Sequence, residues 1–217
     1  MKGLAKDIFK FLQEKNTILT NLKCALTDGT RKMTGWRHGA ISELEELLSH
    51  PLQRLICFNH HVELPFNKLF VFYDGDTTGP STFEGPIGKS IQEEVWQLPI
   101  REFSKIENPI LLSRIENMSV EVFQSLSEGH QHFINIIQGI LKGEINKQWS
   151  EMKIGKVVHS RWTTGQTRIC RLYMSTEEPT YQMQRIVNFI IMVYAPVFLA
   201  TKHFNLAEEG PNEGLMK

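Results

Sequence analysis

Asp28 is the residue best placed to act as a catalytic acid. It follows residues 17–26, whose branched and alternating apolar side chains predict a central strand, and it precedes Gly29 and Thr30. Side chains at the carboxyl end of such a strand project into the crevice above the sheet, where α/β folds place metal-binding and catalytic carboxylates. Phosphoryl transfer by two metal ions needs several carboxylates, so Asp28 cannot perform it alone. The second interpretation is that Asp28 and Gly29 form only a turn.

Cys57 and His60 form a Cys-x-x-His pair at the end of a second predicted strand. This spacing supplies half of a zinc site. The other half is not evident, because His130 and His132 lie far along the chain and Cys170 has no neighbouring ligand. The alternative is that Cys57 is a buried thiol and that His60 caps or packs against the helix that follows.

Arg161 and Trp162 begin a predicted helix that also carries Arg168 and Arg171. Arg161 and Arg168 share one face of that helix by their spacing, and Arg171 lies about one turn further on. We expect a basic patch there, able to hold a phosphate backbone while Trp162 stacks on an unpaired base. The alternative is that Trp162 lies in the core and that the arginines pair with acids such as Glu177.

A phosphate-binding loop for nucleotides is not predicted. Residues 85–90 end in Gly-Lys-Ser, as such loops do, but Phe83 occupies the position where the first glycine is required. Pro86 also lacks the backbone amide that would contact a phosphate. We therefore expect no nucleotide partner.

The overall charge excludes a general attraction to polyanions. Lys and Arg total 24, and Asp and Glu also total 24, so the formal net charge is zero. Binding to nucleic acid or to an anionic membrane must therefore depend on a local patch. The 3 cysteines are too few for a disulfide framework and fit an intracellular protein with reduced thiols.

No segment is predicted to enter a membrane. Residues 1–15 lack the continuous apolar stretch and the cleavage site of a secretory signal. The most apolar stretch, residues 186–200, contains Asn188 and Pro196, and a membrane-spanning helix needs roughly 20 apolar residues. We interpret residues 186–200 as a buried helix of a soluble protein.

The elements that must position these residues form two parts, in a fold dominated by helices. The first part is an α/β front, with a helix over residues 1–15, a strand over 17–26, a helix over 40–49, a strand over 52–58 and a helix over 62–73 that has Pro65 in its first turn. The second part, residues 89–205, is a mostly α-helical body with helices over 89–97, 120–126, 130–141, 160–175 and 181–202. A Gly- and Pro-rich junction loop, residues 74–88, connects the parts, and the tail over 206–217 is expected to be disordered.

The order of these motifs resembles that of hAT-type DNA transposases. The matching residues are Asp28-Gly29-Thr30, Thr34-Gly35, Pro51-Leu52-Gln53, Cys57-x-x-His60-x-x-Glu63 and Arg161-Trp162. The resemblance covers about residues 18–100 and 157–203. It implies a ribonuclease-H-like core interrupted by a long helical insertion domain. Residues 1–73 would then be a partial core, and residues 89–205 an insertion-like domain.

The resemblance also implies roles for single residues. Asp28 matches the second of three catalytic acids, which is a metal ligand, and Trp162 matches a tryptophan that stacks near a flipped base. Cys57, His60 and Glu63 match the structural motif that leads into the insertion. The first catalytic Asp and the final Glu have no counterpart here. Mg²⁺ or Mn²⁺ would therefore be required only if the family's activity survives.

We therefore expect a transposase-derived protein that is not catalytically competent alone, keeps some DNA binding, and is nuclear rather than cytoplasmic. The expected partners are DNA, another protein or a second copy of the chain. Two alternatives stay open. One is a non-enzymatic helical protein-interaction module, and the other is part of an active cut-and-paste transposase that further sequence completes.

Overall fold

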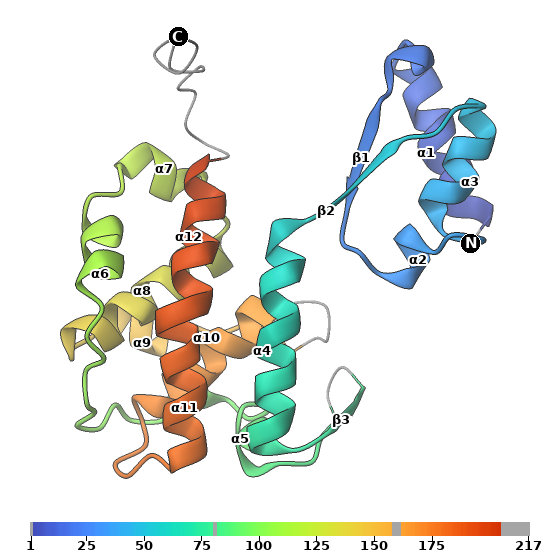
Figure 1. Cartoon of the computed structure of the whole chain (residues 1–217). Coiled ribbons are helices and arrows are strands. Elements are labelled where there is room, and N and C mark those ends of the chain that lie inside the picture. The colour runs from blue at the N-terminus through green and yellow to red at the C-terminus, as the bar shows by residue number, and fades with distance from the viewer. Residues whose placement is uncertain (1, 80–81, 158–161, 205–217) are drawn as a thin grey trace, which may run out of the picture. The chain divides into compact units, whose positions relative to one another are not determined.

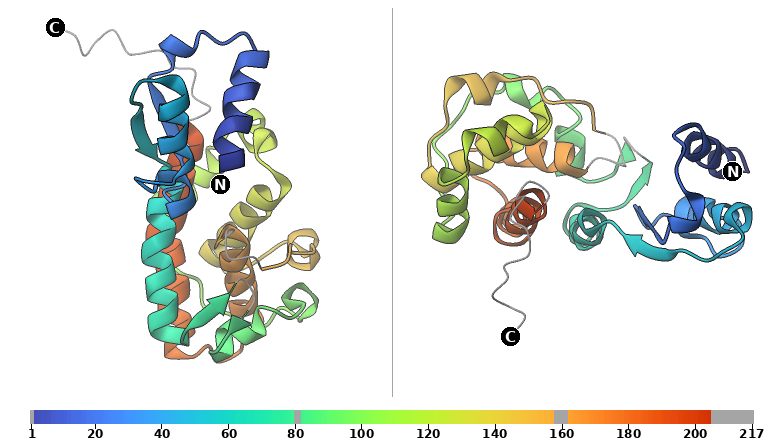
Figure 2. Two further views of the ribbon diagram at one scale, coloured as in Figure 1. Left: turned by 90° about the vertical axis from the view of Figure 1, so that its right-hand side faces the viewer. Right: turned by 90° about the horizontal axis from the view of Figure 1, so that it is seen from above.

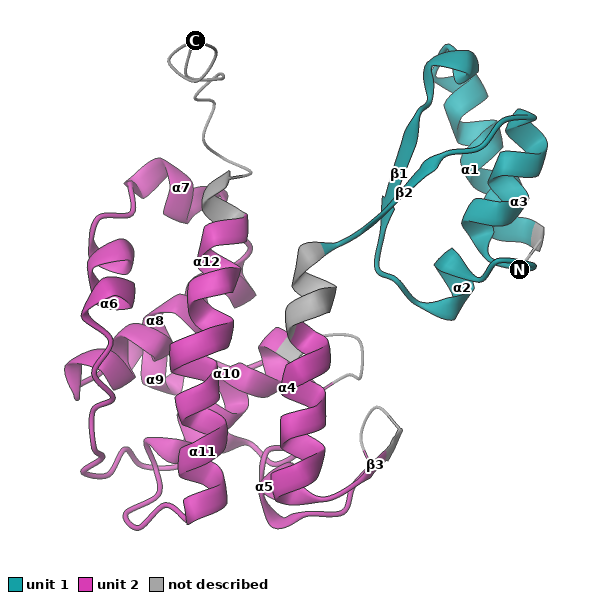
Figure 3. Ribbon diagram, in the orientation of Figure 1, with its two compact units in different colours: residues 1–62 teal, residues 63–217 magenta. Residues whose placement is uncertain are grey.

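The computed structural model describes residues 2–79, 82–157 and 162–204 (Figure 1). Helices dominate the fold, as predicted: 62% of it is helical and 6% is strand. The chain divides into two compact units, Met1–Val62 (unit 1) and Glu63–Lys217 (unit 2), which Figure 3 colours separately. Unit 1 contains a small parallel sheet, and unit 2 is mostly helical.

Unit 1 is a small α/β unit built around a two-stranded sheet. Its elements are α1 (Lys2–Glu14), η1 (Leu19–Asn21), β1 (Cys24–Thr27), α2 (Arg31–Thr34), α3 (Ala40–Leu48) and β2 (Gln53–Ile56). The two strands are parallel, with Cys24 opposite Gln53 and Thr27 opposite Ile56. The first predicted strand begins later than expected, because η1 forms a 3₁₀ turn in its first half. The second strand lies within its predicted range.

The core of unit 1 lies between its helices and one face of the sheet. Ala5, Leu44 and Leu52 are buried at its centre, and partly buried apolar side chains from α1, β1 and α3 pack against them. This follows from the helical spacing of apolar residues in α3, which places Ile41 and Leu44 toward the interior and leaves Glu46 exposed. On the opposite face of the sheet, the cross-strand pair Leu26 and Leu55 is 66% and 43% exposed.

Helix α4 (Phe58–Asp74) runs from the end of unit 1 into unit 2. Because it begins at Phe58, Pro65 lies in the interior of the helix and not in its first turn, where we expected it. Phe66 and Phe70 anchor the helix in the core of unit 2, where both are buried. Most of α4 therefore belongs to the helical unit, whereas the sequence placed it in the α/β front.

The segment predicted as a junction loop, residues 74–88, folds into a hairpin followed by a short helix. Its elements are β3 (Thr77–Gly79) and β4 (Thr82–Phe83), which pair antiparallel, and α5 (Pro86–Ser90). The carboxylate of Asp74 accepts hydrogen bonds from the amides of Ile87 at 2.8 Å and Gly88 at 2.6 Å. These bonds tie the end of α4 to the start of α5. A Cβ atom at Gly85 would lie 1.4 Å from the carbonyl oxygen of Asp74, so only glycine fits there.

The rest of unit 2 is a body of packed helices. Its elements are η2 (Val95–Gln97), α6 (Pro109–Glu116), α7 (Val120–Ser125), α8 (Glu128–Lys142), α9 (Lys147–Glu151), α10 (Trp162–Tyr173), α11 (Tyr181–Phe189), the π-helix η3 (Ile190–Tyr194) and α12 (Ala195–Phe204). The continuous run α11–η3–α12 lies beside α4 (Figures 1 and 2), and the ring of Phe66 is 6.3 Å from those of Phe189 and Tyr194. Helices α8 and α10 supply much of the remaining buried apolar surface of unit 2.

Some helices differ from the predicted ones. The helix expected over residues 89–97 is interrupted, because α5 ends at Ser90 and η2 begins only at Val95. Helix α6 was not predicted, although its start carries clear signals. Asn108 accepts a hydrogen bond from the amide of Leu111 at 3.0 Å, and Pro109 occupies the first helical position. The predicted disordered tail, 206–217, lies outside the described residues.

Among the described residues, one helix, Tyr181–Thr201, is long and apolar enough to cross a membrane by length and composition alone. Half of its most apolar window is buried inside the protein, including Ile186, Ile190 and Phe198. Core helices of soluble proteins share these properties. The burial agrees with the interpretation of residues 186–200 as a buried helix.

Replacing Gly85 by alanine is expected to lower the free energy of unfolding by about 3 kcal/mol, because the new Cβ atom would force the backbone at Asp74 to move. Urea denaturation followed by circular dichroism measures this. Gly165→Ala is the matched control: a Cβ atom there meets nothing within 4 Å, and alanine favours the helix by about 1 kcal/mol. Equal stability of the Gly85→Ala variant and the parent would contradict the tie between α4 and α5.

Candidate functional site

The candidate site lies at the carboxyl edge of the sheet in unit 1. β1 ends at Thr27 and β2 at Ile56, and because the strands are parallel these ends meet at the same edge. The amide of Cys57 donates a hydrogen bond to the carbonyl oxygen of Thr27 at 2.7 Å. Asp28 and Cys57 therefore follow neighbouring strands directly. Among the described residues β1 has a single neighbouring strand, so it is not the central strand that we expected.

The exposed carboxylate of Asp28 organises a turn. Its Oδ1 accepts hydrogen bonds from the amide of Thr30 at 3.2 Å and from Thr30 Oγ1 at 2.8 Å. Gly29 has a φ of 57°, a left-handed conformation that glycine adopts without a steric penalty. Thr34 Oγ1 donates to the carbonyl oxygens of Gly29 and Thr30. The turn interpretation therefore describes the local geometry, and it leaves the carboxylate at the surface.

The residues near Asp28 do not fit a two-metal centre. In the part of the chain that the structure describes, no group of three or more His, Cys, Asp or Glu side chains could hold a metal ion. Cys57 is half-buried, and the side chain of His60 lies outside the described residues, as does the half zinc site that the pair would form. Two-metal phosphoryl transfer needs several carboxylates around the ions. Asp28 alone supplies one.

Glu63 belongs to the same motif but lies on α4, partly buried in unit 2. Loss of hydration raises the pKa of its carboxyl to about 7. Burial also raises the pKa of Tyr194, and the charge of Glu63 adds to that increase, so the two groups lie near each other. The Tyr194 hydroxyl is 3.0 Å from Oγ1 of Thr163 on α10. Glu63 is thus a carboxyl that takes up a proton near neutral pH inside the helical unit.

Arg168 is buried, and backbone carbonyl groups surround its guanidinium. The residue is only 3% exposed. Its guanidinium donates to the carbonyl oxygens of Ile91 at 2.6 Å, Gly155 at 2.8 Å, Glu93 at 2.9 Å and Ile154 at 3.1 Å. Its Cζ also lies 4.9 Å from the centroid of the Trp96 ring, a cation–π contact.

Arg171, one turn further along α10, has a similar environment and is 1% exposed. Its hydrogen bonds go to the carbonyl oxygens of Leu98 at 2.5 Å, Ser150 at 2.7 Å and Trp96 at 3.4 Å, and to Oγ of Ser175. The two arginines therefore bind the chain around η2 and the chain from the end of α9 to Gly155.

The prediction that Arg168 and Arg171 belong to a basic surface patch is wrong. Both side chains are directed into the interior by the carbonyl groups they satisfy, so neither is available to a phosphate backbone. The alternative that they pair with acids such as Glu177 is also not observed, because their hydrogen-bond acceptors are carbonyl and hydroxyl oxygens. Arg161 and the side chain of Trp162 lie outside the described residues.

A different cationic segment, which the sequence reasoning did not single out, is at the surface. It follows the Asp28 turn, and its exposed side chains are Arg31, Lys32, Trp36, Arg37 and His38. The sequence has no acidic residue between Gly29 and Ser42. A run of cations without acids, with a tryptophan among them, is the sequence feature that could have indicated this exposed cationic segment.

Arg168→Met is expected to lower the free energy of unfolding by about 3–5 kcal/mol, because four carbonyl groups lose their donor and two of these hydrogen bonds are buried. Thermal denaturation followed by circular dichroism measures this. Arg114→Met, at an exposed position on α6, should change stability by about 0.5 kcal/mol or less. If Arg168→Met left stability intact and weakened DNA binding instead, the structural role would be refuted.

Glu63→Gln is expected to remove a pH dependence of stability. The pKa of Glu63 is raised from 4.5 to about 7 on folding, so its contribution is fully present below pH 4.5 and is lost as the pH rises through 7. At about pH 8 the variant should be more stable than the parent by about 1–3 kcal/mol, and at about pH 4 the two should be similar. Urea denaturation across this range measures the difference. Glu102→Gln, at an exposed position, should follow the parent, and a Glu63 variant that also did so would disprove the coupling.

Comparisons with known proteins give no assignment. No protein family, curated protein or solved structure matches the chain. The functional interpretation therefore rests on the geometry around Asp28, on the placement of the cations, and on the order of the motifs along the sequence.

Proposed function

We propose that the chain is a transposase-derived protein of the hAT type that associates with nucleic acid and is not a nuclease by itself. The observation that carries this proposal is the path of the chain around Asp28. Asp28 follows β1, the chain continues through α3 to the parallel strand β2, and Cys57 follows at the same edge. α4 then leads from this β–α–β unit into a separate helical unit (Figure 3).

A ribonuclease-H-like core that is interrupted by a helical insertion would give this order of parts. Such a core places an acidic residue at the carboxyl end of a strand, where its side chain reaches the crevice above the sheet. The exposed carboxylate of Asp28 lies at that kind of position. The sheet of unit 1 has two strands within the described residues, so it would correspond to a small part of such a core.

The side chains around Asp28 support association with nucleic acid more than its cleavage. If Mg²⁺ or Mn²⁺ bound here, Asp28 would be one of its ligands, and the metal would supply charge stabilisation to a reacting phosphate. The further carboxylates needed would have to come from sequence outside this chain. The exposed cations that follow Asp28 need no metal to contact phosphates.

We expect the purified protein to bind DNA at low salt and to leave nicked and hairpin DNA uncut in the presence of Mg²⁺ or Mn²⁺. Asp28→Asn should behave as the parent in both assays, because a single carboxylate cannot hold a catalytic metal pair. Gel electrophoresis measures cleavage, and fluorescence anisotropy measures binding. Metal-dependent cleavage that Asp28→Asn abolishes would overturn the inactive assignment. Absence of DNA binding at low salt, where phosphate contacts are strongest, would remove the nucleic-acid role.

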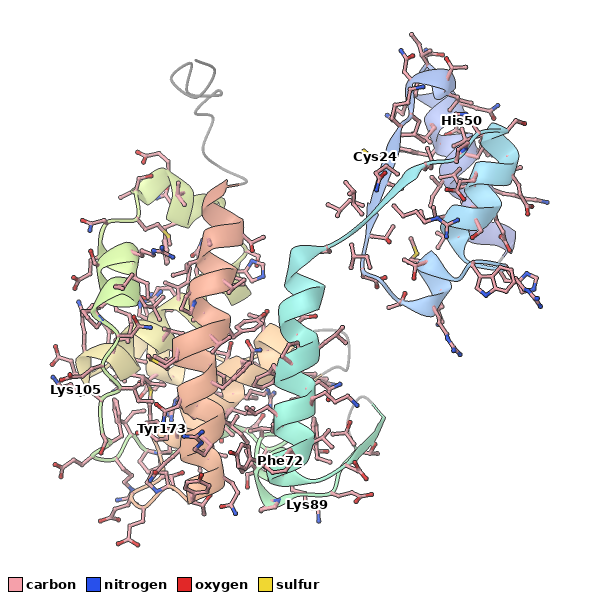
Figure 4. All side chains as sticks on the ribbon, viewed as in Figure 1. Cys24, His50, Phe72, Lys89, Lys105 and Tyr173 are labelled. Carbon is pink, nitrogen blue, oxygen red and sulfur yellow. The ribbon has the colours of Figure 1, made fainter. Side chains whose placement is uncertain are left out.

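A protein-interaction role is the second candidate, and a cluster on unit 2 favours it. Phe72, on α4, is 80% exposed (Figure 4). Its ring lies edge-on to that of Tyr73, with the ring centroids 5.0 Å apart. Tyr73 in turn meets Tyr181 on α11, which Arg185 covers with its guanidinium. Exposed aromatic and arginine side chains dominate many protein interfaces. This candidate becomes the leading one if no nucleic acid binds.

A further inference from the structure

The segment between α2 and α3 presents an unusually exposed tryptophan. Trp36 is 75% exposed, although large aromatic side chains are normally well buried. The guanidinium carbon of Arg37 lies 4.2 Å from the centroid of the Trp36 ring, a close cation–π contact. Most of the indole surface is nevertheless in solvent, where a second planar group can stack on it.

Backbone hydrogen bonds fix the segment that carries Trp36. The amide of Gly35 donates to the carbonyl oxygen of Arg31 at 3.1 Å, and the amide of Gly39 donates to that of Gly35 at 2.8 Å. Ser42 Oγ donates to the same Gly35 oxygen at 2.8 Å. A Cβ atom at Gly39 would lie 2.5 Å from the Gly35 oxygen, so this turn closes only with glycine. The exposed ring is therefore held on a short, well-bonded turn.

An ion pair behind the segment attaches it to the rest of unit 1. Arg54 on β2 pairs with Glu45 on α3 at 2.5 Å. The same guanidinium donates to Ser42 Oγ at 3.1 Å and to the carbonyl oxygen of Thr34 at 3.4 Å. The sheet, α3 and the end of α2 are thereby connected. A binding group that is held in place in this way loses little conformational entropy when a ligand binds.

The charged side chains from Gly29 to Ser42, the stretch of sequence that contains Trp36, are all cationic. Arg31, Lys32 and Arg37 are exposed, and the nearest preceding acid, Asp28, has one carboxylate oxygen bonded to Thr30. Exposed cations that flank an exposed aromatic ring are the combination with which proteins bind single-stranded nucleic acid, because the cations follow the phosphates while the ring stacks on a base. An acidic peptide would use the cations and leave the indole unused.

We propose that Arg31, Lys32, Trp36 and Arg37 bind single-stranded nucleic acid, with Trp36 stacking on an unpaired base and the three cations contacting phosphates. This deepens the proposed function, on which it rests, by assigning its nucleic-acid contacts to unit 1. The site begins three residues after Asp28. A strand bound there therefore passes the carboxyl edge of the sheet.

Fluorescence anisotropy with a labelled oligothymidine of about 20 nucleotides tests the proposal with the full chain. Trp36→Ala should weaken binding about tenfold, and Trp36→Phe should retain most of the affinity, because phenylalanine also stacks. Arg31→Ala and Arg37→Ala should each weaken binding and reduce the slope of log affinity against log salt by about 0.7. Circular dichroism confirms that each variant is folded.

Phe11→Ala is the matched control. Phe11 is 55% exposed on α1 of the same unit, and the Lys15 ammonium lies 5.7 Å from its ring centroid, so it repeats the cation–π arrangement. Phe11 lies near the end of α1, a helix that carries none of the four proposed contact residues. The Phe11 variant should bind the oligonucleotide as the parent does.

Three outcomes would overturn the proposal. If Trp36→Ala bound DNA as tightly as the parent, the stacking site would be refuted while the nucleic-acid role of the chain would stand. If poly-glutamate displaced the oligonucleotide as well as unlabelled oligothymidine does, the segment would be a general anion site that also serves acidic polypeptides. If the parent failed to bind any DNA at low salt, both this proposal and the proposed function would fail together.

Discussion

The guanidinium groups of Arg168 and Arg171 hold unit 2 together where regular secondary structure is missing. The segments before and after η2, the end of α9 and the segment that follows α9 have carbonyl groups that accept hydrogen bonds from these two guanidinium groups. Buried carbonyl groups need donors, and a guanidinium supplies five in a fixed plane. The two side chains leave neighbouring turns of a single helix, α10, so this helix determines where both segments lie. The packing of the remaining helices then follows apolar spacing.

The sequence was informative where a residue's environment depends on its close neighbours. The apolar spacing in α3 and α8 predicted both helices, and the turn at Asp28 was among the interpretations considered. The sequence was misleading where a residue's environment depends on backbone groups that are far from it in the sequence. The burial of Arg168 is caused by carbonyl groups more than 70 positions away in the sequence, at Ile91 and Glu93, and no local pattern reports this. Helical spacing gave the face on which the arginines lie but not whether that face meets solvent.

The predicted nucleic-acid site was near Trp162, whereas the site proposed from the structure is near Trp36. Trp162 and its arginines match the transposase motifs in order along the chain. The cations beside Trp36 match no such motif, and they do not show in the net charge of the chain, which is zero. Exposure separates the two groups, because two of the arginines near Trp162 are interior donors whereas those near Trp36 are in solvent. A parallel sheet is normally covered on both faces. In unit 1 the cross-strand pair Leu26 and Leu55, on one face of the sheet, is 66% and 43% exposed.

The carboxylate of Asp74 has a consequence for protein engineering. It joins the last residue of α4 to the first turn of α5, so the residues between them leave and re-enter the fold at nearly the same point. The hairpin formed by β3 and β4 therefore does not have to span a distance between α4 and α5, so its length can change without moving either helix. A foreign peptide, an epitope or a reporter inserted between Gly79 and Thr82 would therefore leave the register of α4 and α5 unchanged.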